Sequence, residues 1–305
     1  MKRVLAIDVG GTKVASAIVG ADGAISGERR ARTPRTDDPE AVFSALIAIA
    51  KASVEKNGTP IDGIGVGCGG PMRWPEGVVS PLHIPAWRDF PLRARLADVF
   101  GVPCVIDNDA KAFALGEHWL GAGRDSRALL GIVVSTGIGA GIVIDGHLLH
   151  GASGQAGHLG HVLADPDGPK CECGARGCVE AIASGNAIAR RGGADPATIA
   201  EKARAGDADA SRIYVDAGRA LGRGIASAAV LLDLDLIVVG GGVALGAWDL
   251  LEPTLVTELA LRAQLSFTRD VRLKRSALGE RAGLLGAAKL ALDLWVSLAA
   301  KREGS

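Results

Sequence analysis

The sequence has no long hydrophobic run and no excess of either charge. In its 305 residues no apolar stretch reaches the roughly 18 residues that a membrane span needs, because Asp233 and Asp235 interrupt the longest candidate. Lysine plus arginine and aspartate plus glutamate both number 34, so the formal net charge is zero. We therefore expect no binding to nucleic acid or to an anionic membrane through an overall field. Any phosphate binding must be local.

The beginning of the chain has too few apolar residues for a secretory leader. Only Val4–Ile7 are apolar between the basic pair Lys2-Arg3 and Asp8, whereas the core of a signal peptide has about 7 to 15 such residues. The sequence therefore predicts a cytoplasmic protein.

An even disulfide framework is also missing. Of five cysteines, two lie in apolar strand-like segments, while Cys171, Cys173 and Cys178 lie within eight residues of one another. In a reducing cytosol such a cluster indicates metal binding rather than a disulfide. With His161 the three thiolates form the ligand set of a closed structural zinc site. His158 is a rival ligand, and we expect one histidine to bind the metal and the other the substrate.

A glycine-rich hairpin occurs twice among the 43 glycines. The first copy has a strand at 3–7, a turn at 8–12 and a strand at 13–19. The second has an apolar run at 131–134, a polar turn at 135–141 and a strand at 142–144. A third apolar strand, 236–239, ends in three glycines. Two copies of one hairpin predict two similarly built lobes.

Helical patterns lie between the strands. They cover 38–54 and 109–120, the latter after a strand at 102–106, and alternation of strands with helices predicts an α/β fold. The last helix has an apolar stripe that should dock on a lobe, formed by Leu284, Ala288, Ala291, Trp295 and Leu298. We expect a smaller lobe at 1–108, joined by the C-terminal helix 288–305. The larger lobe should span 109–287, with a zinc-binding loop at 157–180.

The turn after the first strand can bind phosphate. It joins two strands, so it is neither a Rossmann fingerprint nor a Walker P-loop. Its glycines let backbone amides approach an anion, Thr12 adds a hydroxyl, and Asp8 can hold Mg²⁺ or its waters. An ordinary Gly-Gly hairpin is the alternative, but the second copy favours a nucleotide bound by both hairpins, as in actin-like ATPases. The residues expected to bind it are Asp8, Gly10, Gly11, Thr12, Lys13, Thr136, Gly137 and Gly139.

Asp107-Asn108-Asp109 ends a strand and begins a helix, where α/β folds present reactive side chains. Asn108 or Asp109 can simply cap the helix. Alternatively, a carboxylate here accepts the proton of an attacking hydroxyl while the neighbouring amide orients that hydroxyl.

Together these motifs resemble the ROK family of bacterial sugar kinases and repressors over nearly the whole chain. The resemblance also rests on Gly69-Gly70-Pro71, on Pro81–Trp87 and on the cysteine motif extended to Glu180. It implies a two-lobed actin-like ATPase fold of the ribonuclease H-like, hexokinase and Hsp70 type. It further implies ATP, Mg²⁺ and structural zinc as cofactors, and a homodimer.

The resemblance implies a role for several residues. Asp109 falls on the catalytic base for in-line attack of a sugar C6 hydroxyl on the γ-phosphorus of ATP. Gly241 and Gly242 fall on the adenosine side. The residues that fall at the sugar are Gly70, Asn108, Asp109, His158, His161 and Glu180.

One departure from the family pattern concerns the sugar. Most family glucokinases carry Gly-Glu-x-Gly-His, and here His158 replaces the glutamate. An imidazole can donate a hydrogen bond to an acyl carbonyl, which a carboxylate cannot. This replacement, with the segments 163–166 and 179–185, is similar to bacterial N-acetylmannosamine kinases. Glucose or another hexose is the alternative substrate, and His83, where the family often has asparagine, leaves the choice open.

Two readings outside catalysis remain. A sugar-binding sensor without kinase activity would keep the fold but does not need Asp109 and both hairpins, and an actin-like filament protein does not explain the cysteines. Family repressors carry a winged helix before the first hairpin, which here starts at residue 3. Without a basic cluster, DNA binding is not expected.

Overall fold

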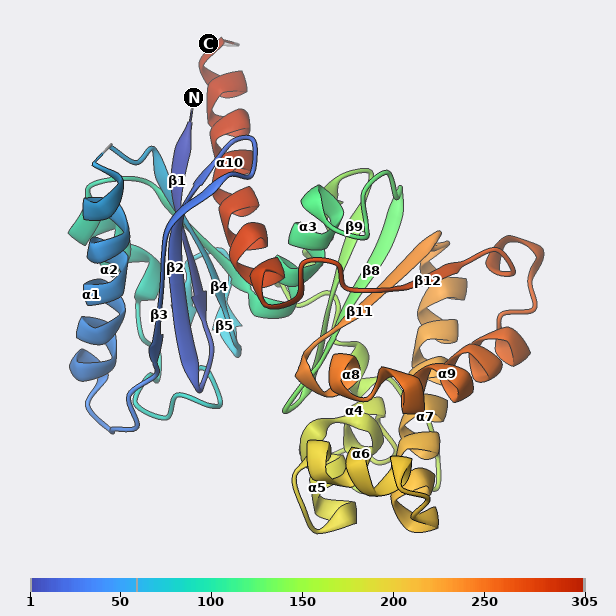
Figure 1. The fold of residues 1–305 in the computed structure, drawn as a ribbon. Coiled ribbons are helices and arrows are strands. Elements are labelled where there is room, and N and C mark those ends of the chain that lie inside the picture. Colours follow the sequence, from blue (N-terminus) through green and yellow to red (C-terminus); the bar gives the residue numbers. More distant parts are fainter. Residues whose placement is uncertain (1, 59, 304–305) are drawn as a thin grey trace. The chain divides into compact units, whose positions relative to one another are not determined.

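The chain divides into two compact units in the computed structural model, which describes residues 2–58 and 60–303 (Figure 1). The first unit comprises Met1–Gly121, His150–Ala156 and Glu280–Ser305, and the second comprises Ala122–Leu149 and Gly157–Gly279. The sequence had led us to expect the helix at 109–120 in the second unit. The structure places it in the first unit. The helix lies there because it packs against the C-terminal helix and against strands of the first unit.

The elements of the first unit follow the predicted alternation of strands and helices. They are β1 (Arg3–Val9), β2 (Lys13–Gly20), β3 (Ile25–Arg32), α1 (Pro39–Asn57), β4 (Gly63–Cys68), β5 (Met72–Arg73), β6 (Val78–Val79), α2 (Leu92–Phe100), β7 (Cys104–Asn108), α3 (Asp109–Leu120) and α10 (Ala282–Glu303). Asp38 caps α1 by accepting a hydrogen bond from the N–H of Glu40, close to the predicted start.

Strand β4 shows how the first unit is layered. The main sheet has the order β3-β2-β1-β4-β7, and β4 alternates glycine with larger apolar residues. Because successive strand residues point to opposite faces, Ile64, Val66 and Cys68 enter the core that includes residues of α1 and α2. The glycines face the other way, and a Cβ on Gly65 would lie 1.7 Å from the carbonyl oxygen of Ala287 in α10. The absence of side chains on this face lets α10 lie directly on the strand.

Helices α3 and α10 also approach each other through glycine. A Cβ on Gly286 would lie 1.6 Å from the carbonyl oxygen of Ala112, and one on Gly116 would lie 2.2 Å from that of Ala282. Leu284, Ala288 and Ala291 of the predicted stripe are buried. The side chains of Trp295 and Leu298 lie outside the described part of the chain.

The second unit contains the remaining elements. They are β8 (Ala128–Val134), β9 (Ile138–Ile144), β10 (His147–Leu148), α4 (Val179–Ala183), α5 (Gly185–Gly192), α6 (Pro196–Arg204), α7 (Ala208–Leu232), β11 (Leu236–Gly240), α8 (Gly242–Gly246), α9 (Trp248–Arg262) and β12 (Arg272–Arg275), with single 3₁₀ turns at Leu159–His161, Ser266–Thr268 and, joining the units, Gly279–Arg281. Helix α7 packs mainly against α9, α4 and α6.

The two main sheets share one topology. The second sheet has the order β10-β9-β8-β11-β12. In each sheet the first two pairings are antiparallel and the last two are parallel. The duplicated hairpin of the sequence therefore reflects a duplicated sheet.

The second hairpin turn is shorter than expected. Strand β9 begins at Ile138, which pairs with Val134, so Gly139 and Gly141 lie in the strand rather than in the turn. We had expected a turn at 135–141 because these residues are polar or glycine. Hydrogen bonding to β8 instead makes residues 138–141 part of a strand. Among the helices built from residues 2–58 and 60–303, none is long and apolar enough to cross a membrane.

Candidate active site and metal centre

The turn between β1 and β2 is closed by its own backbone. The N–H of Gly10 donates to the carbonyl oxygen of Lys13 at 3.0 Å, and the Thr33 hydroxyl donates to the carbonyl oxygen of Gly10 at 2.7 Å. Gly11 has no room for a side chain, because a Cβ would lie 2.2 Å from the Cβ of His83. The Gly10 amide is therefore already used, and an anion at this turn would meet the amides of Gly11 and Thr12.

Lys13 is held by an acidic residue of the same unit. Its Nζ lies 2.8 Å from Oε1 of Glu280, which also pairs with Arg30. Both side chains of the Lys13 pair are exposed to solvent. The ion pair is therefore weak, and the ammonium can exchange Glu280 for a phosphate at small cost.

Three parallel strands end at one edge of the first sheet and bring Asp8 and Asp109 close together. Asp8 lies opposite Gly67, and Cys68 lies opposite Asn108, so β1, β4 and β7 end at one edge of the sheet. A Cβ on Gly67 would lie 3.6 Å from the Cα of Asp109 and 3.9 Å from Oδ1 of Asp8. Gly67 therefore lies between the two aspartates, and a Cβ there would also lie 3.1 Å from the Cβ of Ala112.

Burial raises the pKa of Asp8 to about 7, and the negative charge of Asp109 adds to the shift. The carboxyl lies at the first turn of α10, since a Cβ on Gly283 would lie 3.1 Å from its Oδ2. Two carboxylates this close repel each other unless a proton or a cation lies between them. A divalent cation at Asp8 would relieve this repulsion.

Asn108 and Asp109 combine capping with an open oxygen. The Oδ1 atoms of Asn108 and Asp109 accept hydrogen bonds from the N–H of Ala110 at 3.0 and 2.8 Å. Asn108 is therefore the N-cap of α3, and Asp109 is its first residue. Asp109 nevertheless reaches solvent, and its Oδ2 lies toward the backbone at Gly69. The surrounding protein atoms raise the pKa of Asp109, with a smaller opposing effect of His83. A raised pKa suits a group that takes a proton during the reaction.

A buried ion pair behind Asp109 was not foreseen from the sequence. Lys111 and Asp107 are both buried, with Nζ 3.2 Å from Oδ1, and Lys111 also donates to the carbonyl oxygen of Gly154 at 2.7 Å. Nδ1 of His150 lies 3.1 Å from Oδ2 of Asp107. These contacts fix the segment 150–156 to the start of α3. The Asp-x-x-x-Lys spacing at a helix start was the only signal in the sequence.

In the second unit Glu180 lies against the second hairpin. Its Oε2 accepts a hydrogen bond from the N–H of Ile138 at 2.7 Å and would lie 2.8 Å from a Cβ on Gly137. The N–H of Ser135 donates to the carbonyl oxygen of Gly137 at 2.9 Å. The amides of Thr136 and Gly137 are thus the ones left to face an anion. Gly139 contributes to the ladder with β8 instead.

The two histidines flank the same hairpin. A Cβ on Gly160 would lie 2.5 Å from the carbonyl oxygen of Ile138 and 3.3 Å from the Cβ of Glu180. The rings of His158 and His161 are stacked with centroids 6.1 Å apart, and both residues are exposed. The structure therefore brings Glu180, His158 and His161 together.

Gly241 and Gly242 follow β11 but differ in their surroundings. Gly241 has a φ of +91°, and a Cβ there would lie 2.3 Å from the carbonyl oxygen of Val134. A Cβ on Gly242 would meet nothing within 4 Å. Backbone geometry requires the first glycine, whereas the second leaves open space.

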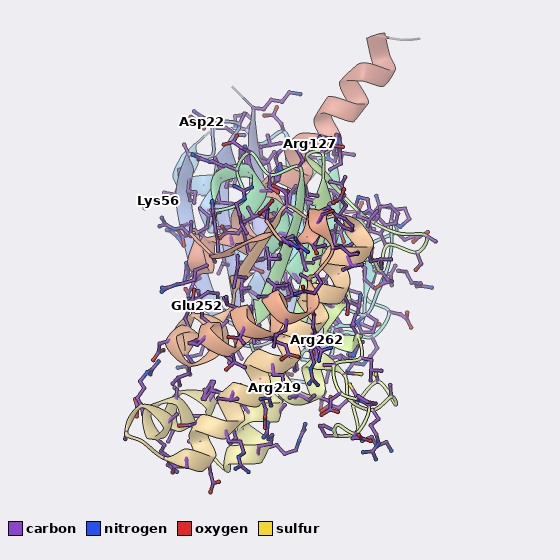
Figure 2. The ribbon with its side chains drawn as sticks, turned by 90° about the vertical axis from the view of Figure 1, so that its right-hand side faces the viewer. Asp22, Lys56, Arg127, Arg219, Glu252 and Arg262 are labelled. Atoms are coloured by element: carbon purple, nitrogen blue, oxygen red, sulfur yellow. The ribbon has the colours of Figure 1, made fainter. Side chains whose placement is uncertain are left out.

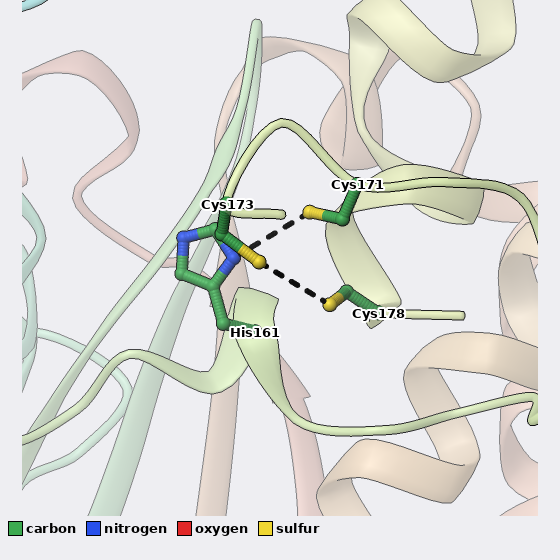
Figure 3. A group of neighbouring side chains, drawn as sticks. All are labelled: His161, Cys171, Cys173 and Cys178. Atoms are coloured by element: carbon green, nitrogen blue, oxygen red, sulfur yellow. Dashed lines mark hydrogen bonds between the residues drawn. The ribbon is translucent and has the colours of Figure 1, made fainter. Parts of the chain in front are cut away.

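The cysteine cluster has the geometry of a metal site (Figure 3). One ligand atom from each of His161, Cys171, Cys173 and Cys178 lies within 4.8 Å of all the others. The sulfurs of Cys173 and Cys178 are 3.8 Å apart, and Nδ1 of His161 is 3.7 Å from the sulfur of Cys171. Zinc–sulfur bonds of about 2.3 Å at the tetrahedral angle separate two sulfurs by about 3.8 Å. The four residues therefore fit zinc.

Glycine permits this convergence. Gly177 has a φ of +72°, and a Cβ there would lie 1.6 Å from the carbonyl oxygen of Asp165. Gly174 has a φ of +96°. All five cysteines have free thiols, as expected for a metal site rather than a disulfide framework.

Comparison with known proteins identifies the family. The family model described as "ROK family" matches residues 4–294. The chain belongs to the ROK family. A relative named N-acetylmannosamine kinase, from Citrobacter koseri, is 40% identical over 295 residues, which cover 94% of this chain and 98% of the relative.

Solved structures of ROK proteins share this fold. A ROK hexokinase from Thermus thermophilus is 37% identical with a TM-score of 0.86, covering 97% of this chain and 99% of its own. A ROK family glucokinase from Streptomyces griseus, solved with glucose and AMPPNP, is 30% identical with a TM-score of 0.80, covering 95% and 99%. The expected actin-like ATPase fold is confirmed.

The expected site residues of this ROK protein thus form two groups, one in each unit. The first unit holds Asp8, Gly10, Gly11, Thr12, Lys13, Gly70, Asn108 and Asp109. The second holds Thr136, Gly137, Gly139, His158, His161, Glu180, Gly241 and Gly242, next to the cysteines. Gly70 lies beside Asn108, since a Cβ on it would be 3.9 Å from Nδ2.

Proposed function

We propose that this ROK protein is an ATP-dependent kinase that phosphorylates the C6 hydroxyl of N-acetylmannosamine. The observation that carries the proposal is the pair of carboxyl groups, Asp8 and Asp109, on either side of Gly67 at one sheet edge. A phosphoryl transfer needs a cation beside the phosphates and a base beside the attacking hydroxyl. The pair offers one carboxylate for each task. The similarity to N-acetylmannosamine kinases supports the choice of sugar.

In this mechanism Asp109 accepts the proton of the C6 hydroxyl as its oxygen attacks the γ-phosphorus. Asn108 orients the sugar from the same strand end, and its own side chain is fixed by the bond to Ala110. Bound Mg²⁺ would neutralise charge on the phosphates, and Asp8 is the residue that would hold it or its waters. Within the first unit the Gly11 and Thr12 amides, and within the second unit the Thr136 and Gly137 amides, are the ones available to phosphate oxygens.

The side chains around His161 would select the sugar. Zinc, when bound by His161 and the three cysteines, would fix the loop that carries both histidines. Glu180 would accept hydrogen bonds from sugar hydroxyls through an oxygen not used by Ile138. His158 would donate to the acyl carbonyl at C2, which a glutamate there could not do. We place the reaction in the cytoplasm and propose a homodimer, testable by light scattering.

The test is ADP release with ATP and Mg²⁺ in a panel of N-acetylmannosamine, N-acetylglucosamine, mannose and glucose. N-acetylmannosamine should give the highest kcat/KM. Preferential turnover of glucose would instead favour a glucokinase, the second candidate, which the likeness to the Streptomyces griseus enzyme supports.

The base is tested by Asp109→Asn. Because general base catalysis contributes about 10²–10⁴-fold, kcat should fall by that factor while the melting temperature does not decrease and the zinc content stays unchanged. Asp98→Asn, an exposed aspartate on α2, is the matched control and should keep full activity. A folded Asp109→Asn protein with normal kcat would rule out this base. Binding of sugar with no ADP release by the wild-type protein would indicate a sensor.

A further inference from the structure

A pocket lies wholly within the second unit and contains none of the residues assigned to the reaction. It has a volume of about 400 Å³ and lies among the zinc loop, α4, α5 and α7. Four arginines and two aspartates line it, namely Arg190, Arg191, Arg219, Arg223, Asp165 and Asp216. This volume is in the range of small-molecule sites.

The arginines are only partly neutralised. Asp216 accepts hydrogen bonds from both Arg191, at 2.6 Å, and Arg219, at 3.0 Å, so one carboxylate serves two guanidinium groups. Arg223 pairs with Glu258 at 2.9 Å. Arg190, within the part of the chain that the structure describes, has no ion pair or hydrogen bond and is exposed. The pocket therefore carries an excess of positive charge.

The rest of the pocket wall is apolar. Ala181, Ile182 and Ala220 line it and are buried. Guanidinium groups bind phosphate oxygens in pairs, and an apolar wall favours a ligand with a carbon skeleton. Inorganic phosphate would use only the arginines.

We propose that this pocket binds a small phosphate monoester. Arg190 and Arg219, the latter labelled in Figure 2, would contact the phosphate group, and Ile182 would contact the carbon skeleton. The pocket also shares α4 with the candidate active site. Ala181 and Ile182 line the pocket, while Glu180 on the same helix bonds to Ile138.

Because α4 has only five residues, a ligand against it should alter the position of Glu180. The bound ester should therefore change the KM for the sugar by about fivefold or more, the lower end of typical coupling between sites. This second statement rests on the proposed function, whereas binding itself does not.

The experiment is isothermal titration of the full-length protein with glycerol 3-phosphate and with inorganic phosphate. The double variant Arg190→Gln/Arg219→Gln removes the two guanidinium groups proposed to contact the phosphate, so it should weaken glycerol 3-phosphate binding at least tenfold. The fold should be preserved, because Asp216 keeps Arg191 as its partner. Arg212→Gln, an exposed arginine on α7 outside the pocket, is the matched control. Inorganic phosphate should bind more weakly than the ester.

No saturable binding to the wild-type protein, or equal binding to a double variant with unchanged melting temperature, would overturn the proposal. Equal affinity for phosphate and ester would show that the apolar wall does not bind the carbon skeleton of the ester. Binding that leaves the sugar KM unchanged would refute the coupling, and a protein that binds the ester but phosphorylates no sugar would refute the proposed function instead.

Discussion

At the scale of single residues, Asp8 makes the stability of the first unit depend on pH. Its pKa is raised from an ordinary 3.8 to about 7 in the folded protein, by burial and then by Asp109. Between about pH 4 and pH 7 the unfolded chain has lost this proton while the folded chain still holds it. The free energy of unfolding therefore decreases as the pH rises through this window.

Replacing Asp8 by asparagine should remove this penalty. In the absence of Mg²⁺ and nucleotide, Asp8→Asn should unfold at higher urea concentration than the wild-type protein at pH 8, and the difference should disappear toward pH 4. The same variant should lose kinase activity, because an amide binds Mg²⁺ poorly. Asp37→Asn, an exposed aspartate of the same unit, is the control and should follow the wild-type curve. Parallel stability curves for Asp8→Asn and wild type would contradict the assignment.

The neighbouring glycines after β11 should respond differently to alanine. Gly241→Ala adds a Cβ at positive φ and 2.3 Å from the Val134 carbonyl oxygen, so it should destabilise the protein by about 1–3 kcal/mol or more. Gly242→Ala adds a Cβ in open space at the first residue of α8 and should leave stability nearly unchanged.

The family resemblance puts Gly242 on the adenosine side, so its alanine variant should raise the KM for ATP. Urea denaturation and ATP titration separate the two effects. A stable Gly241→Ala protein, or a Gly242→Ala protein with normal KM for ATP, would show that the two positions are wrongly assigned.

At the scale of elements, we predict that the cysteine segment of the loop 157–180 becomes ordered through a bound zinc ion. Leu159 and Ala164, near the start of the loop, belong to the main core of the second unit, whereas the cysteine segment has only a small cluster of Cys171, Cys178 and Ala181 of α4. Metal bonds would therefore fix the backbone of the cysteine segment. Metal analysis of the purified protein should therefore find one zinc ion per chain.

Removal of one ligand should release that zinc. Cys178→Ser replaces a buried ligand and should lower both zinc content and melting temperature, whereas Cys104→Ala, in the first unit, should keep the zinc. Full zinc occupancy in Cys178→Ser would show that the metal is held elsewhere.

Several elements were predictable from the sequence, because glycine, aspartate and strand periodicity act locally. The hairpin at Asp8–Lys13, the start of α1 and the ligands Cys171–Cys178 belong to this group. The start of β9 at Ile138 was not, because pairing with β8 decides it. The segment 150–156 was also missed, since its anchor, Lys111, is distant in sequence.

At the scale of the whole molecule, the first unit requires α10 to complete its core. Gly286→Ala places a Cβ 1.6 Å from the Ala112 carbonyl oxygen, so α3 and α10 must move apart. We expect a loss of about 1–3 kcal/mol in the free energy of unfolding, as for other overpacked cores. Zinc content should stay unchanged, because the metal ligands lie in the second unit. Gly246→Ala, which meets nothing within 4 Å, is the control for urea denaturation. Equal stability of both variants would mean that the two helices do not depend on this close approach.

The position of α10 in the chain also sets an order for synthesis. The first unit's strands and α3 are complete at residue 121, but α10 begins at residue 282, about 160 residues later. At translation rates of about 5–20 residues per second, the ribosome takes about 10–30 s to make that stretch. During this time the second unit can fold, while the glycine-lined faces of β4 and α3 are not yet covered by α10.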